Sequence, residues 1–356
     1  MKTNGRVTVK ELSKILGVSA MTITNALTGH PNVSEQKRAE IIKKANELGY
    51  KPNLHARAMV KNGIRLGVVW SREPREFNSY FMKGIHEGVE RNADYKISVS
   101  EHYYRDNRAT FEVRDAISAT LADGVDGLML GHSFYTDTYR DMLKDYVMKH
   151  DLPLFHYSSQ IEDVPCVATI MPNASVTGKM VAQVFRMVLG KGAAVGVITT
   201  TPLFAAHQKT VEAFVKYCGN EGLHVTEVLE NHDSKIKTYD CARELIEKYP
   251  ELRAIYVTCF DSSTVCRCIE NMGRKGRIFV VGHDIYPEMV EYLMNGSILA
   301  AIFNNPILAG RMGVDLFCNY ILGNRAACGE VLIDPQLVLR SNLECFKEYL
   351  SDSDAP

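Results

Sequence analysis

Hydrophobic residues recur at helical spacing in three short stretches near the start of the chain. Thr8 and Glu11 form a capping box before the first stretch, which Gly17 ends, and Ser19 can cap the second. A third stretch covers residues 34–48. Two short helices joined by a tight turn with glycine predict a helix-turn-helix, and the third helix completes a small core. An ordinary helical hairpin is the alternative that this stretch alone leaves open.

The two faces of the second predicted helix differ in polarity. Ile23, Ala26 and Leu27 fall on one face and should pack against the other two helices. The opposite face carries Ala20, Met21, Thr24 and Asn25.

From Ile64 onward, short apolar runs alternate with amphipathic helical stretches. The predicted strands cover residues 65–70, 95–99, 126–130, 152–156, 194–199, 224–229, 254–259, 277–282 and 298–303. The predicted helices lie near residues 79–93, 108–122, 136–150, 174–189, 207–221, 235–249, 262–272, 287–295 and 306–322. Regular alternation of this kind predicts parallel sheets covered by helices. Nine such strands fit two sheets better than one.

Charge divides the chain into two unequal parts. Residues 1–63 carry a net charge of +7, and the remainder of the 356-residue chain carries −8. A small basic head on an acidic body indicates a polyanionic partner for the head only. Residues 51–63 have a helical composition but nothing nearby in sequence to pack on, so they should become ordered only against a partner.

Several function classes are disfavoured by what the sequence lacks. It shows no apolar signal core and no apolar run long enough to span a bilayer, so we expect a cytoplasmic protein. Its nine cysteines show no zinc or redox spacing and are expected to be buried thiols. A P-loop, a dinucleotide fingerprint and a GxSxG motif are all missing. We therefore expect no metal, no cofactor and no catalytic residues, and we do not expect an enzyme.

Residues 7–60 carry several spaced motifs in a fixed order. These are Val7-Thr8, Leu12-x-x-x-Leu16-Gly17-Val18-Ser19, Thr22-Ile23, Val33-Ser34, Leu48-Gly49-Tyr50-x-Pro52-Asn53 and Ala56-Arg57. In this set the chain resembles the DNA-binding head of the LacI/GalR family of bacterial transcription regulators. The resemblance implies DNA contacts by Thr8, Ser19, Ala20, Met21, Thr22, Asn25, Asn53, Ala56, Arg57 and Met59. Among these, Ala20, Met21 and Asn25 would face base edges, and Thr8, Ser19, Thr22 and Asn53 would contact phosphates.

Two positions of the head depart from the family pattern. Asn25 stands where the family commonly has Arg, and Asn can pair bidentately with adenine instead of guanine. Met59 replaces the hinge Leu that wedges into the minor groove, and Met is apolar and long enough for the same role. We therefore expect DNA binding with an operator sequence that differs from the usual one.

The α/β part resembles the periplasmic-binding-protein-like sensor domain of the same family. The expected fold is thus a small all-α helix-turn-helix domain followed by an α/β domain of two subdomains with two parallel sheets. The expected limits are 1–50 for the head, 51–63 for the hinge helix and linker, 64–346 for the sensor and 347–356 for a tail. By the resemblance, the first subdomain comprises about 64–165 and 298–325, and the second about 166–297 and 326–346.

Polar and aromatic residues follow the predicted strands, and ligands of open α/β sheets bind beyond the carboxyl ends of strands. Asp284 matches the family Asp that holds ligand hydroxyls, and Asp261 is retained where the family has Asn-Asp. Thr210 lies where the family usually has a ligand-contacting Arg. The residues expected to contact a ligand are Phe77, His132, Asn173, Phe260, Asp261, Asp284 and Asn304.

These expectations describe a DNA-binding transcription regulator, most simply a repressor, controlled by a sugar or sugar derivative in the sensor cleft. The family implies a homodimer on a pseudo-palindromic operator, and the chain shows no C-terminal leucine heptad for a coiled-coil tetramer. The residues leave three alternatives open: a solute-binding protein without a DNA role, a regulator of a non-sugar effector, and an enzyme on a similar two-lobed fold.

Overall fold

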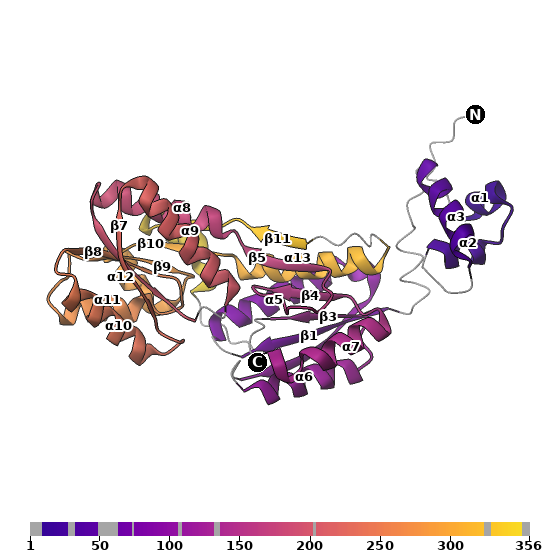
Figure 1. Cartoon of the computed structure of the whole chain (residues 1–356), viewed down its shortest axis with the longest axis horizontal. Helices are drawn as coiled ribbons and strands as arrows, with labels where there is room; N and C mark the ends of the chain where they lie inside the picture. Colours follow the sequence, from indigo (N-terminus) through magenta and orange to yellow (C-terminus); the bar gives the residue numbers. More distant parts are fainter. Residues whose placement is uncertain are drawn as a thin grey trace.

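The computed structural model of this chain describes residues 9–27, 33–48, 63–72, 75–105, 109–131, 136–201, 204–323 and 329–350. These residues form an N-terminal head of three helices and two α/β lobes, each built on one six-stranded sheet (Figure 1). Apart from Gly63, the predicted hinge over 51–63 lies outside the described residues.

The head is a small three-helix unit. Its helices are α1 (Val9–Leu16), α2 (Ala20–Leu27) and α3 (Glu35–Glu47). Gly17 adopts a positive φ of 64°, which lets the backbone turn sharply between α1 and α2 without a clash from a Cβ. The core is formed by the buried side chains of Leu12, Ile23, Ala26, Val33, Ile41 and Ala45. Because Ile23 and Ala26 face this core, the opposite face of α2 is turned to solvent.

The first lobe holds a fully parallel sheet in the order β11-β5-β4-β3-β1-β2. Its strands are β1 (Ile64–Ser71), β2 (Ile97–Tyr104), β3 (Gly127–Leu130), β4 (Leu154–Tyr157), β5 (Ala168–Pro172) and β11 (Gly329–Ile333). Its helices are α5 (Arg75–Arg91), η1 (Ala93–Tyr95), α6 (Thr110–Ala122), η2 (Thr136–Thr138), α7 (Arg140–His150) and α13 (Pro306–Ile321). Helices α6 and α7 cover one face, and α5 and α13 cover the other.

The second lobe holds a sheet in the order β12-β10-β9-β8-β6-β7, parallel except for the pair β10 and β12. Its strands are β6 (Ala194–Thr199), β7 (His224–Glu230), β8 (Leu252–Val257), β9 (Phe279–His283), β10 (Ile298–Phe303) and β12 (Gln336–Val338). Its helices are α8 (Ala174–Leu189), α9 (Ala205–Glu221), α10 (Lys235–Lys248), α11 (Ser262–Asn271), α12 (Pro287–Met294) and η3 (Arg340–Tyr349). Helices α8 and α9 pack on one face, and α10, α11 and α12 pack on the other.

The structure corrects the expected division of the sensor into subdomains. We expected 64–165 with 298–325 in one subdomain and 166–297 with 326–346 in the other. Instead, β5 and β11 pair with each other in the first sheet, and β10 lies in the second sheet. The chain therefore changes lobe after β5, after β10 and between β11 and β12. The reason is that β5 and β11 lie more than 150 residues apart, and nothing in their local patterns specifies that pairing.

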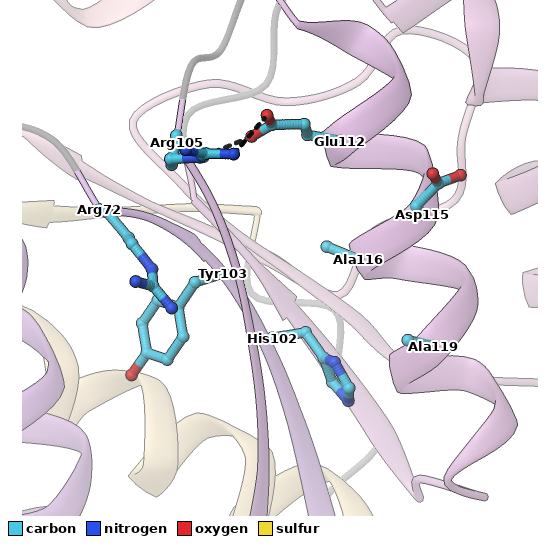
Figure 2. A pocket seen from close by; sticks show the side chains of 8 residues that line it. All are labelled: Arg72, His102, Tyr103, Arg105, Glu112, Asp115, Ala116 and Ala119. Atoms are coloured by element: carbon cyan, nitrogen blue, oxygen red, sulfur yellow. Dashed lines mark hydrogen bonds and ion pairs between the residues drawn. The ribbon is translucent and has the colours of Figure 1, made fainter.

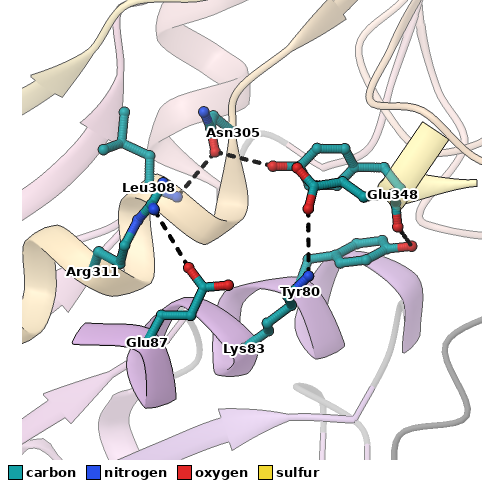
Figure 3. A network of polar contacts seen from close by, with 8 residues as sticks. Tyr80, Lys83, Glu87, Asn305, Leu308, Arg311 and Glu348 are labelled. Carbon is teal, nitrogen blue, oxygen red and sulfur yellow. Dashed lines mark hydrogen bonds and ion pairs between the residues drawn. The ribbon is translucent and has the colours of Figure 1, made fainter. Parts of the chain in front are cut away.

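The predicted tail at 347–356 is also corrected where it is described. Residues 340–349 form η3, and the ring of Tyr349 packs against those of Tyr80 on α5 and Phe303 on β10, with centroids 4.9 and 4.6 Å apart. The hydroxyl of Tyr80 donates to the backbone oxygen of Glu348 at 3.1 Å (Figure 3). The C-terminal segment up to Leu350 thus ties the second lobe to α5 of the first, because apolar surface of Tyr349 is buried there.

Candidate functional site

The exposed face of α2 is the candidate DNA interface. Ser19 caps the helix, because its hydroxyl accepts a hydrogen bond of 3.0 Å from the backbone N–H of Thr22, and the two hydroxyls lie 2.8 Å apart. Ala20 is exposed, Met21 is 69% exposed, and Asn25 is half-buried. Because the apolar side chain of Met21 is so exposed near the N-terminus of α2, it is available for contact with a macromolecule.

Several predicted site residues fall outside the described part of the chain. In the head these are Thr8, Asn53, Ala56, Arg57 and Met59, and in the sensor the residue is His132. Their assignment stays a prediction.

The second candidate site lies where the carboxyl ends of strands from both lobes meet, and we refer to it as the junction. Tyr157 at the end of β4 and Asp284 after β9 are close enough that the aspartate charge raises the pKa of the tyrosine, in addition to the larger effect of burial. Three residues other than glycine adopt a positive φ just beyond strand ends here: Ser158, Asp284 and Asn305. Such backbone conformations cluster at functional sites.

The residues that the first lobe places around Tyr157 at the junction are aromatic. The ring of Tyr157 lies with its centroid 5.8 Å from Phe77, 5.2 Å from Phe81 and 5.7 Å from Trp70. Trp70 and Phe81 stack at 3.7 Å, and the indole N–H of Trp70 donates to Asn78 Oδ1 at 2.8 Å. The predicted Phe77 therefore belongs to an aromatic cluster that ends at the junction.

Polar side chains supply the junction side of the second lobe. The hydroxyl of Thr258 donates to that of Thr199 at 2.7 Å, and His207 Nδ1 lies 3.2 Å from the Thr258 hydroxyl. The hydroxyl of Tyr256 and His283 Nε2 are joined by a hydrogen bond of 2.5 Å. Burial lowers the pKa of His283 to about 3 and also lowers that of His207, so both imidazoles are neutral at pH 7.

Asp284 stands apart among these groups. Its carboxylate accepts a backbone hydrogen bond from Asn304, but among the described residues Oδ1 has no hydrogen-bond partner although solvent does not reach it. Burial raises the pKa of this carboxyl group to about 7. Asn304 itself is buried, and its Oδ1 likewise has no partner in the described part of the chain. Two neighbouring oxygen atoms, Asp284 Oδ1 and Asn304 Oδ1, can thus accept hydrogen bonds from a ligand.

Two other predicted ligand residues are engaged within the protein. The carboxylate of Asp261 accepts hydrogen bonds from the hydroxyls of Thr238 at 2.7 Å and Thr264 at 2.8 Å. The side chain of Asn173 caps α8 through the N–H of Val176 and donates to Asp334 at 2.7 Å. These bonds give both residues a structural role at the lobe crossings and at α11.

Phe260 and Thr210 are also placed by contacts within the second lobe. The ring of Phe260 lies 4.1 Å from that of Tyr286, centroid to centroid. Thr210, where the family commonly has Arg, is buried, and its hydroxyl donates to the Ala206 carbonyl within α9 at 2.8 Å. Thr210 is therefore no substitute for the missing Arg.

The structure adds Tyr157, Trp70 and Thr258 to the residues around the junction. In the sequence, only their position marks these residues as candidates for a site, since each lies at or just beyond the end of a buried strand. Position at a strand end does not reveal which ends face each other, so that signal was too weak to separate these residues from their neighbours.

A shallow depression of about 590 Å³ lies away from these groups, between β2 and α6 (Figure 2). Its charged side chains are largely paired: Arg105 with Glu112, and His102 with Asp123. Arg72 lies over the ring of Tyr103 at 5.6 Å. The described residues include no group of His, Cys, Asp or Glu that could hold a metal ion. Within the same residues, every helix is too short or too polar to cross a membrane.

A helix-turn-helix head joined to a two-lobed α/β sensor defines a class of ligand-responsive DNA-binding regulators. Residues 8–53 match the family described as bacterial regulatory proteins, lacI family, and residues 66–325 match the periplasmic binding protein domain. The chain therefore belongs to the lacI family of bacterial regulatory proteins. This confirms the family resemblance and the fold class inferred from the sequence.

Two curated relatives are transcription regulators of Bacillus subtilis (strain 168). The chain is 21% identical to the HTH-type transcriptional regulator KdgR over 354 residues, which cover 96% of this chain and 99% of KdgR. It is 35% identical to the NTD biosynthesis operon regulator NtdR over 122 residues, which cover only 33% of this chain and 36% of NtdR. Both relatives carry the names of regulators, not enzymes.

A solved structure shows the same sensor fold. GanP, a glucose-galactose binding protein from Geobacillus stearothermophilus, superposes with a TM-score of 0.69 at 17% identity, covering 79% of this chain and 99% of GanP. At this identity the likeness concerns the fold alone.

Proposed function

We propose that this protein is a cytoplasmic repressor whose affinity for its operator is set by a sugar or sugar derivative bound at the junction. It acts as a homodimer, which places two heads on the half-sites of a pseudo-palindromic operator. The observation that supports the sensing role is that Tyr157 of one lobe lies within electrostatic range of Asp284 of the other. A ligand held between them bridges the lobes and changes how they are set relative to each other.

The chemistry of the junction supports a carbohydrate ligand. The half-buried ring of Phe77 beside Tyr157 offers apolar surface, and Asp284 and Asn304 offer acceptors for hydroxyl donors. Small-molecule sites commonly combine apolar walls with a few well-placed polar groups. GanP, which shares the fold of the two lobes, is described as a glucose-galactose binding protein.

The coupling between ligand and operator follows from linkage. The two lobes position the hinge segments of the two chains, and the hinge over 51–63 is predicted to order only against DNA. Ligand and operator must therefore change each other's affinity by the same factor. An inducer binds more weakly to the operator complex than to the free protein, and a corepressor binds more tightly.

Ala20, Met21 and Asn25 are proposed to read bases. The exposed thioether of Met21 suits the methyl group of thymine, and the amide of Asn25 suits adenine. Selection of duplexes from a random pool by the full-length chain will give the operator. Asn25→Ala should relax the preference at one base pair in each half-site, with a loss of discrimination of about 1–3 kcal/mol.

The matched control is Ile42→Ala, which also removes a partly exposed, uncharged side chain but from α3. It should leave the selected sequence unchanged. Affinity of the wild-type chain should fall steeply with salt, because Lys and Arg contacts to phosphate release counterions. Absence of binding to any duplex at low salt, or an unaltered preference for Asn25→Ala, would contradict the proposal.

A further inference from the structure

The acceptor atoms at the junction form an electronegative spot. Asp284 Oδ1 and Asn304 Oδ1 are both inaccessible to solvent, and neither has a hydrogen-bond partner among the described residues. They are adjacent, since the Asn304 backbone donates to the Asp284 carboxylate. A buried carboxylate oxygen without a hydrogen-bond partner is costly, and a cationic donor would supply both the hydrogen bond and the opposite charge.

The described side chains around Asp284 supply no positive charge. The carboxylate feels burial and the Asn304 backbone, and no Lys or Arg of the described part acts on it. His283 and His207 are neutral at pH 7 because burial lowers the pKa of both. Thr210, at the position of the family Arg, bonds to its own helix. Arg72 turns toward Tyr103, and Lys209 pairs with Glu330.

We propose that the ligand itself brings the missing charge: a protonated amine, as in an amino sugar, that donates to Asp284 Oδ1 with Asn304 as a second acceptor. An ammonium group carries three donors and no acceptor, which matches a spot made only of acceptors. Charge-assisted hydrogen bonds of this type are roughly twice as strong as neutral ones. Tyr157, an aromatic residue of the other lobe, lies within electrostatic range of Asp284. This inference rests on the proposed sensing function and narrows its ligand class.

The test compares matched sugars on the full-length chain. The panel is built on glucose, galactose and mannose. For each parent sugar, one hydroxyl at carbon 2, 3 or 6 is replaced by an amine to give an amino sugar. Each amino sugar is compared with its parent and with its own N-acetyl derivative. Dissociation constants are measured by calorimetry at pH 7.5, above the pKa of about 7 that burial gives Asp284. At least one amino sugar should bind ten times or more tightly than both its parent and its N-acetyl form.

Asp284→Asn, which keeps the shape and removes the charge, should abolish that preference. Asp137→Asn is the control, since it removes one negative charge from an exposed position in η2. It should leave the preference intact. Thermal unfolding of Asp284→Asn without sugar checks that the variant is folded.

Three results would overturn the inference: no amino sugar in the panel binds, a parent sugar binds as well as its amino form, or the preference survives in Asp284→Asn. Operator binding by the same preparation is measured in parallel. If it persists and responds to a neutral sugar, the regulator function stands and only the amine is wrong. If the chain binds neither duplex nor any sugar, the proposed function fails as well.

Discussion

The two lobes have the same architecture but bring opposite chemistry to the junction. On the first lobe, Trp70, Phe81 and Tyr157 form a packed aromatic cluster, and the indole N–H of Trp70 donates to Asn78. On the second lobe, the corresponding strand ends carry Asp284 and His283, in a set of buried polar groups. Under the proposed function, the first side contributes apolar surface to the ligand site, and the second side recognises the ligand's polar substituents.

From this difference we infer that the aromatic residues of the first lobe contribute mainly to stability and the polar residues of the second lobe mainly to recognition. The aromatic cluster gains from burial whatever the ligand is, so it should dominate the stability of the first lobe. The polar set includes acceptors without a hydrogen-bond partner among the described residues, so it should cost stability. Under the proposed function these acceptors serve to bind the ligand. Three substitutions would sharpen or break this contrast.

The largest effect is expected for Trp70→Ala. Trp70 is fully buried, and truncation leaves a cavity and removes the partner of Asn78, so unfolding should become easier by about 3–5 kcal/mol. Urea unfolding should be followed by circular dichroism, because Trp70 is the single tryptophan of the chain. Phe111→Ala, at an aromatic residue that is 64% exposed on the same lobe, should change stability by no more than about 0.5 kcal/mol. Equal losses in the two variants would refute the role given to the cluster.

A smaller effect of opposite sign is expected for Asp284→Asn. Because the folded-state pKa of Asp284 is raised from 3.8 to about 7, the folded state holds this proton while the unfolded state releases it. Wild-type stability from this group therefore falls as pH rises from about 4 to about 7. At pH 8 the variant should be more stable by on the order of 2–4 kcal/mol, since one pKa unit corresponds to about 1.4 kcal/mol.

The measurement is the difference in unfolding free energy between wild type and Asp284→Asn at several pH values. Taking the difference removes the contributions of all other titrating groups. It should approach zero near pH 4 and grow toward pH 7. A difference that is constant with pH, or a variant less stable at pH 8, would show that Asp284 is satisfied in the protein.

The smallest effect is expected for Tyr256→Phe. It removes the hydroxyl that bonds His283 and leaves the ring in place, so the loss should be about 0.5–1.5 kcal/mol. Tyr217→Phe is the control, since the hydroxyl of Tyr217 has a weaker contact of 3.4 Å with Ser175 at an exposed site. If Tyr256→Phe leaves the free energy of unfolding unchanged, the buried pair of Tyr256 and His283 does not contribute to stability.

Much of this protein was readable from its sequence because the relevant interactions are local. Helix capping at Ser19, the turn at Gly17 and the apolar spacing of Ile23 and Ala26 define the head within twenty residues. Short apolar runs predicted nine strands of the two sheets, because a strand that is buried on both faces of its sheet is apolar along its whole length. Asp284 was singled out by its position after a strand and by family resemblance.

Only the tertiary structure decided how distant segments pair and which polar groups remain without partners. The short strands β5, β11 and β12 were missed, and the lobe assignment of β10 was wrong, because strand pairing across long separations leaves no local pattern. Tyr349 was placed in a polar tail, yet it is buried against Tyr80 from the other lobe. Whether Asp284 or Asp261 keeps a free acceptor depends on the hydroxyls that folding brings to each: Thr238 and Thr264 satisfy Asp261, and no described side chain satisfies Asp284 Oδ1.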